Sequence, residues 1–164
     1  MGLANTCMTL NMQESATRLQ VRKIMRKSRK WVLVMDDEMI MRQVICSMLE
    51  EKGYRTYGAS NGEEAINSYM KARNCGYVFD AVILDLHVKR GKNGKEAMSD
   101  LLAVDPDVRA ILATDDSADT IAVNFRAFGF REVLPKPFTP QQLDEAVQNV
   151  LDDKGRVYET AVNC

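Results

Sequence analysis

The sequence predicts a doubly wound α/β fold, in which helices cover both faces of a five-stranded parallel sheet. Three observations lead to this class. Five short apolar stretches follow one another from residue 31 onward, a helical pattern follows each of them, and turn or capping residues separate the two. Strands that alternate with helices need crossover connections, and such connections give parallel strands. The 164 residues are enough for one such domain and too few for two.

The expected strands are short apolar runs, and several of them are apolar at every position. This pattern is typical of a parallel sheet that is buried on both faces. The expected strands are 31–35, 54–59, 81–84, 110–113 and 132–134.

The first three expected helices carry apolar residues at three- and four-residue spacing. The first contains Met41 and stops at Gly53, where glycine can end a helix. The segment 60–63 (SNGE) is a capping box that opens the second helix. The third helix is expected over 95–104, before Pro106.

The last two expected helices have equally clear limits. The fourth covers 121–128, with aromatic residues on its inner side, and closes at Gly129. A second capping box at 139–142 (TPQQ) opens the fifth helix, with proline at its first helical position, and this helix stops before Gly155.

Charge is distributed unevenly along the chain. The net charge is −1, yet residues 1–30 hold seven basic residues and one acidic residue, and residues 31–164 carry −7. We therefore expect a basic N-terminal leader over 1–30, flexible or partly helical, an acidic domain over 31–152 and a C-terminal tail over 153–164. The acidic domain argues against a nucleic-acid-binding module, and no apolar run is long enough for a transmembrane helix.

The cysteines and the histidine exclude two further classes of site. Cys7, Cys46, Cys75 and Cys164 form no C-x-x-C pair, which favours free thiols in a reducing cytoplasm over a disulfide framework. His87 is the single histidine, so a zinc site built from several histidines is excluded.

Polar residues stand at the carboxyl ends of four of the expected strands. They are the acidic residues 36–38, Asp85, Thr114 and Lys136. Because ligands bind beyond the carboxyl ends of parallel strands, we expect these side chains to meet in one crevice. Helix capping is the simpler explanation for an acid after a strand, and it suffices for Glu38. It does not suffice for Asp85, because a nine-residue loop follows before the next helix.

Such a crevice has the ligands for a metal ion and an anion. Clustered carboxylates repel one another, and a divalent cation among them removes that repulsion. Ligands that offer only oxygen point to Mg²⁺. Lys136 and Thr114 supply the cation and the hydroxyl donor that a phosphoryl group needs. The residues therefore predict a site for a phosphoryl group next to Mg²⁺.

Four segments carry a resemblance to a known family. They are VLVMDDE (32–38), VILDL (82–86), ILAT (111–114) and LPKPF (134–138). In this order and spacing the chain resembles, over residues 31–152, the receiver domain of two-component response regulators. The segments 87–98 and 123–138 look most like receivers attached to hybrid sensor histidine kinases. The resemblance implies the flavodoxin-like strand order 2-1-3-4-5.

The resemblance also implies the roles of the acidic residues. Asp85 would be the phosphoacceptor. Asp36, Asp37 and Asp85 would hold Mg²⁺, together with the main-chain carbonyl of His87. A carboxylate can attack a phosphoryl donor in line and form an acyl phosphate, so the chemistry of the residues agrees.

The remaining implied roles concern signalling. Thr114 would be the switch hydroxyl that moves onto the phosphoryl group, Lys136 would pair with its oxygens, and the Lys136–Pro137 peptide would be cis. Such a domain catalyses only its own phosphorylation and dephosphorylation. Its partners would be a histidine kinase or a histidine phosphotransfer protein, and a downstream protein on the fourth and fifth βα units.

The sequence departs from the family at three positions. Asp115 follows the switch threonine, where a small residue is usual, Lys89 replaces a common proline, and Val133 replaces a frequent aromatic residue. An inward Asp115 would add a fourth carboxylate to the site. The simpler expectation has Asp115 turned to solvent, with Asp116 or Ser117 capping the next helix.

Three other functions compete with a phosphorylated receiver. A flavodoxin-like electron carrier is disfavoured because the acids at 36–38 would repel the flavin phosphate. A haloacid-dehalogenase-type phosphatase needs a second aspartate two residues after its nucleophile, and His87 stands there. A degenerate receiver that binds partners without phosphorylation has Asp115 as its only support. His87 itself is expected to be a loop residue rather than a phosphocarrier.

Overall fold

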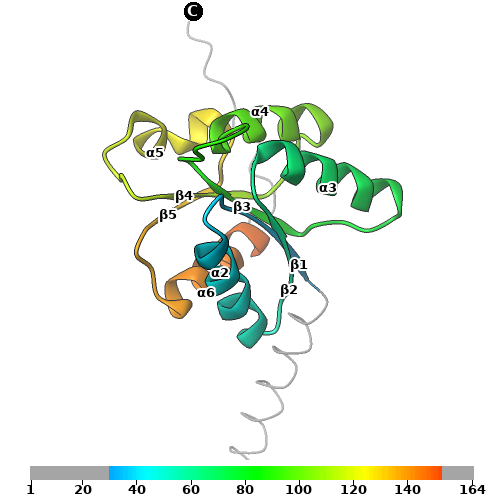
Figure 1. Cartoon of the computed structure of the whole chain (residues 1–164), viewed down its shortest axis with the longest axis horizontal. Coiled ribbons are helices and arrows are strands. Elements are labelled where there is room, and N and C mark those ends of the chain that lie inside the picture. The colour runs from blue at the N-terminus through cyan, green and yellow to red at the C-terminus, as the bar shows by residue number, and fades with distance from the viewer. Residues whose placement is uncertain (1–29, 153–164) are drawn as a thin grey trace, which may run out of the picture.

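The structure is a computed structural model that describes residues 30–152. Its centre is a five-stranded parallel sheet in the order β2-β1-β3-β4-β5, as the resemblance implies (Figure 1). The strands are β1 (Trp31–Met35), β2 (Arg55–Ala59), β3 (Ala81–Asp85), β4 (Ala110–Thr114) and β5 (Glu132–Pro135). The C-terminal tail and the N-terminal leader, except Lys30, lie outside the described residues.

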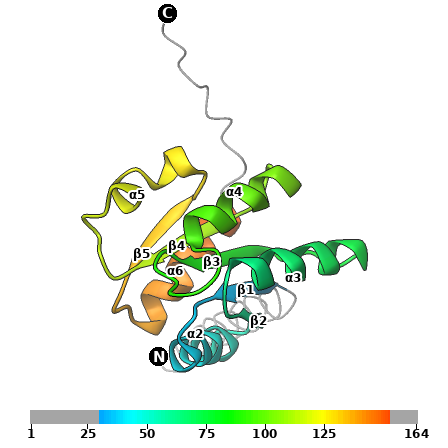
Figure 2. The same ribbon diagram turned by 45° about the horizontal axis from the view of Figure 1, so that its top comes forward.

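Helices cover both faces of the sheet. They are α2 (Met39–Glu51), α3 (Gly62–Asn74), α4 (Gly94–Val104), α5 (Thr120–Val123) and α6 (Pro140–Asp152), and a 3₁₀ helix spans Phe125–Phe128. Helices α3, α4 and α5 lie on one face, and α2 and α6 lie on the other (Figures 1 and 2). None of the helices in 30–152 is both long and apolar enough to cross a membrane.

Two buried cores explain why the strands are apolar at successive positions. Leu33 and Met35 of β1 pack into the core below α3 and α4, whereas Val32 and Val34 pack into the core below α2 and α6. Successive side chains of a strand point to opposite faces, so a sheet covered on both sides needs apolar residues throughout.

The helix starts differ from the prediction at one capping box and agree at the other. Asn61, not Ser60, caps α3 by accepting a hydrogen bond from the backbone N–H of Glu64 at 2.9 Å. Glu64 closes back on Ser60, so the predicted box at 60–63 is wrong by one position. At α6 the predicted box is confirmed, because Thr139 and Gln142 bond to each other reciprocally.

The fourth predicted helix is interrupted, which corrects the prediction of one helix over 121–128. Its first part, α5, ends at Val123, and the side-chain amide of the next residue, Asn124, donates to the carbonyl of Thr120 at 2.9 Å. An asparagine that binds the backbone in this way competes with helix propagation, and a 3₁₀ helix follows. Gly129 ends it with φ 91°, as predicted. The cap of α5 is Asp119, so neither Asp116 nor Ser117 holds that position.

Candidate functional site

The carboxyl ends of β1 and β3 bring the predicted acidic residues together. The register pairs Met35 with Leu84, so Asp36 and Asp85 stand level on adjacent strands. Oxygens of Asp36, Asp37 and Asp85 lie within 4.8 Å of one another. Asp36 and Asp85 are buried, with 1% and 3% of their surface exposed, whereas Asp37 is half-buried. Three carboxylates therefore share one small volume.

Lys136 reaches this cluster from the end of the edge strand β5. It follows β5, its backbone N–H donates to the carbonyl of Thr114, and its peptide bond to Pro137 is cis. Its ammonium lies 2.9 Å from Oδ2 of Asp36 and 3.1 Å from Oδ1 of Asp85. The side chain is only 7% exposed, so the charge is held in place by these carboxylates.

The charges at the site are incompletely balanced. Burial raises the pKa of Asp85, and the charge of Asp36 raises it further, whereas Lys136 acts in the opposite direction. Burial lowers the pKa of Lys136, but the hydrogen bond to Asp36 and the charge of Asp85 outweigh burial, and the pKa is raised. One ammonium thus faces three carboxylates, and the site retains an attraction for cations.

One oxygen of Asp85 has the properties of a metal ligand. Oδ1 is buried and, within residues 30–152, accepts no hydrogen bond, although the Lys136 ammonium lies close to it. A buried acceptor without a donor is unfavourable unless another group binds it. Carboxylate oxygens without sulfur or imidazole ligands suit a hard divalent cation such as Mg²⁺. The residues present therefore fit Mg²⁺.

The acidic segment after β1 is held by backbone donors. Oδ1 of Asp36 accepts from the backbone N–H of Glu38 at 2.9 Å, and Oδ2 of Asp37 accepts from the backbone N–H of Lys89 at 3.1 Å. Glu38 stands at the N-cap position of α2 but makes no capping hydrogen bond with its side chain. The simple capping role expected for Glu38 is therefore wrong.

The loop between β3 and α4 depends on a glycine that the sequence patterns did not single out. A Cβ atom at Gly94 would lie 2.5 Å from the backbone oxygen of Asp85, so only glycine allows the start of α4 to approach β3 this closely. Asn93 caps α4 in a complete capping box with Glu96, and Gly94 is the first residue of that helix. The capping pattern in the sequence could therefore have pointed to Gly94. The exposed His87 belongs to the same loop.

Thr114 is buried at the end of β4, and its hydroxyl is engaged by the following loop. Oγ1 donates to the carbonyl of Asp116 at 3.2 Å and accepts from the backbone N–H of Asp116 at 3.1 Å. Asp115 is exposed and is not part of the carboxylate cluster found among residues 30–152. The exposure of Asp115 favours the outward orientation of its side chain. Val133 is half-buried against the core below α3 and α4.

Comparisons with known proteins show what this chain is similar to. The family model described as "Response regulator receiver domain" matches residues 32–148. Protein CcdB of Bacillus subtilis is 35% identical over 121 residues, which cover 73% of this chain and 96% of that protein. The chemotaxis protein CheY of Thermotoga maritima is 27% identical over 122 residues, covering 74% of this chain and 97% of that protein.

The fold has close counterparts among solved structures. The response regulator TrrA of Thermotoga maritima, in complex with Mg²⁺ and BeF, superposes with a TM-score of 0.64 at 30% identity. That comparison covers 74% of this chain and 99% of the other.

Proposed function

The chain belongs to the family of response regulator receiver domains of two-component signalling, and from this premise we propose that Asp85 accepts a phosphoryl group with the help of Mg²⁺. One observation carries the proposal. Asp85 ends the central strand β3, and its buried oxygen Oδ1 lies 3.1 Å from the Lys136 ammonium, beside two further carboxylates. The phosphoryl donor would be a histidine kinase or a histidine phosphotransfer protein.

Each residue of the cluster has a distinct role in this reaction. A carboxylate oxygen of Asp85 attacks the phosphorus, a new oxygen–phosphorus bond forms, and the phosphorus–nitrogen bond to the donor histidine breaks. Asp36, Asp37 and Asp85 would hold Mg²⁺, together with the carbonyl of His87. The ion would supply positive charge beside the transferring oxygens.

Lys136 changes partners during phosphoryl transfer in this proposal. Before transfer its ammonium pairs with Asp36 and Asp85 at 2.9 and 3.1 Å. Once Asp85 is phosphorylated, the phosphoryl oxygens replace the carboxylate oxygen as acceptor, and Lys136 can pair with them without leaving its buried position. Its charge is already desolvated and in place, so little reorganisation opposes the reaction.

Thr114 connects phosphorylation to the surface of the protein. To reach a phosphoryl oxygen, its hydroxyl must give up the two hydrogen bonds that it makes with Asp116. The loop between β4 and α5 would then rearrange, which biases the surface of the fourth and fifth βα units between two states. Val133 replaces the aromatic residue of many receivers, so the rearrangement proceeds here without an aromatic rotamer.

An apolar surface beside the cluster suits the phosphoryl donor. At the start of α2, Met39 and Ile40 are 59% and 73% exposed, and Val44 is 40% exposed one turn later. Large exposed apolar side chains grouped on one helix favour a protein contact.

We assign residues 31–152 to the receiver domain, 1–30 to a leader and 153–164 to a tail. A reducing cytoplasm, expected from the cysteine pattern of the sequence, is part of the proposal.

The degenerate receiver remains the alternative, and Asp115 was its only support. Because Asp115 is exposed and outside the carboxylate cluster, it gives this alternative little support. Neither the electron carrier nor the phosphatase agrees with the family to which the chain belongs.

Acetyl phosphate tests the assignment of Asp85 directly. With Mg²⁺ present, the intact mass of the wild type should increase by one phosphoryl group, and Asp85→Asn should gain none. Asp115→Asn is the matched control, since it removes an exposed carboxylate near the site and should still be phosphorylated. A phosphoryl group on Asp85→Asn would contradict the assignment, and an unmodified wild type would favour the degenerate receiver.

The donor surface needs a separate experiment. Ile40→Asp should slow phosphoryl transfer from the cognate histidine kinase while leaving the reaction with acetyl phosphate unchanged, because Ile40 is exposed and outside the acidic cluster. Equal transfer rates from the kinase to both proteins would exclude this surface.

A further inference from the structure

A cavity lies at the amino-terminal ends of β1 and β2, and the acidic cluster lies at the carboxyl-terminal end of the sheet. Its volume is about 520 Å³, within the range of small-molecule sites. Trp31 and Arg55, the first residues of β1 and β2, line it together with Lys71 near the end of α3 and Phe79 in the loop before β3. Asp36, by contrast, follows the last residue of β1. The two sites are therefore separated by the length of the strand.

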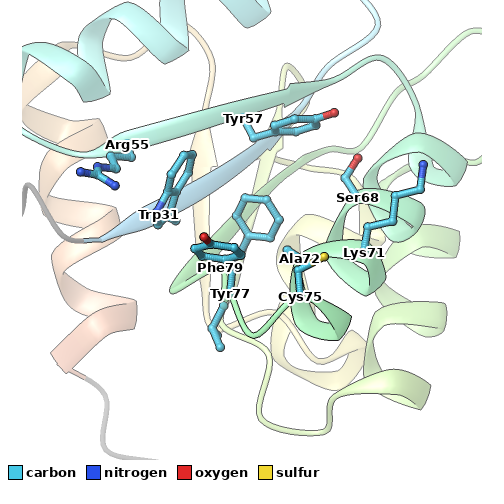
Figure 3. A pocket seen from close by; sticks show the side chains of 10 residues that line it. Trp31, Arg55, Tyr57, Ser68, Lys71, Ala72, Cys75, Tyr77 and Phe79 are labelled. Atoms are coloured by element: carbon cyan, nitrogen blue, oxygen red, sulfur yellow. The ribbon is translucent and has the colours of Figure 1, made fainter.

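The walls of this cavity are mainly aromatic. The ring of Phe79 packs edge-on against Trp31, with centroids 6.5 Å apart, and lies 6.2 Å from the ring of Tyr57. Figure 3 shows these rings and that of Tyr77 gathered around the opening. Tyr57 and Tyr77 remain 46% and 66% exposed. Flat apolar faces that stay accessible to solvent suit a flat, apolar ligand.

The charges around the cavity have one sign. Arg55 and Lys71 stand at its two ends (Figure 3), and within residues 30–152 neither forms an ion pair with a carboxylate. The Arg55 guanidinium lies 5.5 Å from the centre of the Trp31 ring. The nearby Asp80 does not line the cavity, since it pairs with Lys30 at 2.7 Å and accepts from the backbone N–H of Trp31. Both cations are thus available to an anion.

We propose that this cavity binds an aromatic molecule that carries a carboxylate or a similar acidic group. The ring would pack against Trp31 and Phe79, and the acidic group would pair with Arg55 or Lys71. Charge disfavours two other occupants. The basic leader carries a net charge of +6 over residues 1–30 and would be repelled, and a second copy of the chain would present the same two cations.

The chain contains a built-in reporter for this site. Trp31 is the only tryptophan of the 164 residues, so a nitrogen-15 NMR spectrum of this chain shows one indole N–H signal from the cavity wall. We would titrate with 2-naphthoate and with 2-naphthamide, which has the same ring without the charge. The naphthoate should shift the signal saturably and bind about threefold or more tightly than the amide. Equal affinities, or no saturable shift with either compound, would overturn the proposal.

Variants separate charge recognition from a general apolar affinity. Arg55→Gln and Lys71→Gln should each weaken naphthoate binding by about threefold and leave naphthamide binding nearly unchanged. Lys52→Gln is the matched control, because Lys52 does not line the cavity. Ala72→Leu should weaken both compounds by filling the space. A loss of naphthoate affinity in Lys52→Gln equal to that in Lys71→Gln, or no loss in either cavity variant, would contradict the site. The dispersion of the nitrogen-15 NMR spectrum verifies that each variant is folded.

Discussion

Replacing Asp85 by asparagine should stabilise the protein when divalent cations are absent. The oxygens of the acidic cluster lie within 4.8 Å of one another, and at that limit two carboxylate charges repel by about 3.5 kcal/mol for an effective dielectric of about 20. Asp85 has two such neighbours, Asp36 and Asp37, and one attractive contact with Lys136 at 3.1 Å, worth about 5 kcal/mol. The attraction of Lys136 offsets much of this repulsion, and burial is the largest penalty for the charged form.

Asparagine removes this charge while Lys136 keeps its contact with Asp36 at 2.9 Å. Because Asp37 is half-buried and partly screened, we expect the free energy of unfolding to rise by about 1–2 kcal/mol at neutral pH. Denaturant titration in the presence of EDTA measures this difference. Asp115→Asn, which removes an exposed charge, should change the stability by less than about 0.5 kcal/mol.

The pH and Mg²⁺ dependence of the difference identifies its cause. Burial raises the pKa of Asp85 in the folded protein above its pKa in the unfolded chain. The ionised Asp85 therefore destabilises the folded protein at a pH above the folded pKa. This destabilisation disappears as the pH falls to the pKa of the unfolded chain. The advantage of Asp85→Asn should shrink in the same window. Saturating Mg²⁺ should stabilise the wild type more than the variant, which has lost a ligand. A variant that is less stable than the wild type in EDTA at neutral pH would refute this reasoning.

Three further perturbations follow from the same contacts. Gly94→Ala should lower the free energy of unfolding by about 2–3 kcal/mol, because its Cβ would meet a backbone oxygen at 2.5 Å. Gly76→Ala, at φ 78° in open space, should lower it by only about 1 kcal/mol, and denaturant titration compares the two. Burial and the hydrogen bond to Asp105 raise the pKa of Tyr69, so stability should fall as the pH rises above about 10, where the unfolded tyrosine ionises. Tyr69→Phe should show a smaller alkaline loss in thermal unfolding, and an identical loss would argue against this bond. Asp115→Ala should accept phosphate from acetyl phosphate within about twofold of the wild-type rate, because an exposed charge is screened. A several-fold increase would place that carboxylate at the phosphoryl group.

Much of the candidate site could be predicted because parallel strands end at a common edge. Asp36 and Asp85 stand at the ends of two apolar runs that are typical of buried strands. When these strands pair in parallel, the two acids lie next to each other at the carboxyl end of the sheet. The sequence could not show that Thr114 bonds to Asp116, or that Gly94 must lie against the backbone of Asp85. Those contacts depend on how a loop folds back over a strand.

The sequence by itself determined the order and type of the main elements, since hydrophobic periodicity and capping residues act over a few neighbouring positions. The interruption at Asn124 could not be predicted from apolar spacing, because one side chain redirected a helix that this spacing favoured. Only the tertiary structure revealed the cavity around Phe79, whose walls come from three segments distant in sequence. The sequence predicts separate strands and a helix for the segments that contain Trp31, Tyr57 and Lys71. These residues line one cavity only because β1 and β2 pack against α3. Contacts between distant segments depend on the packing of the whole domain, which no local pattern contains.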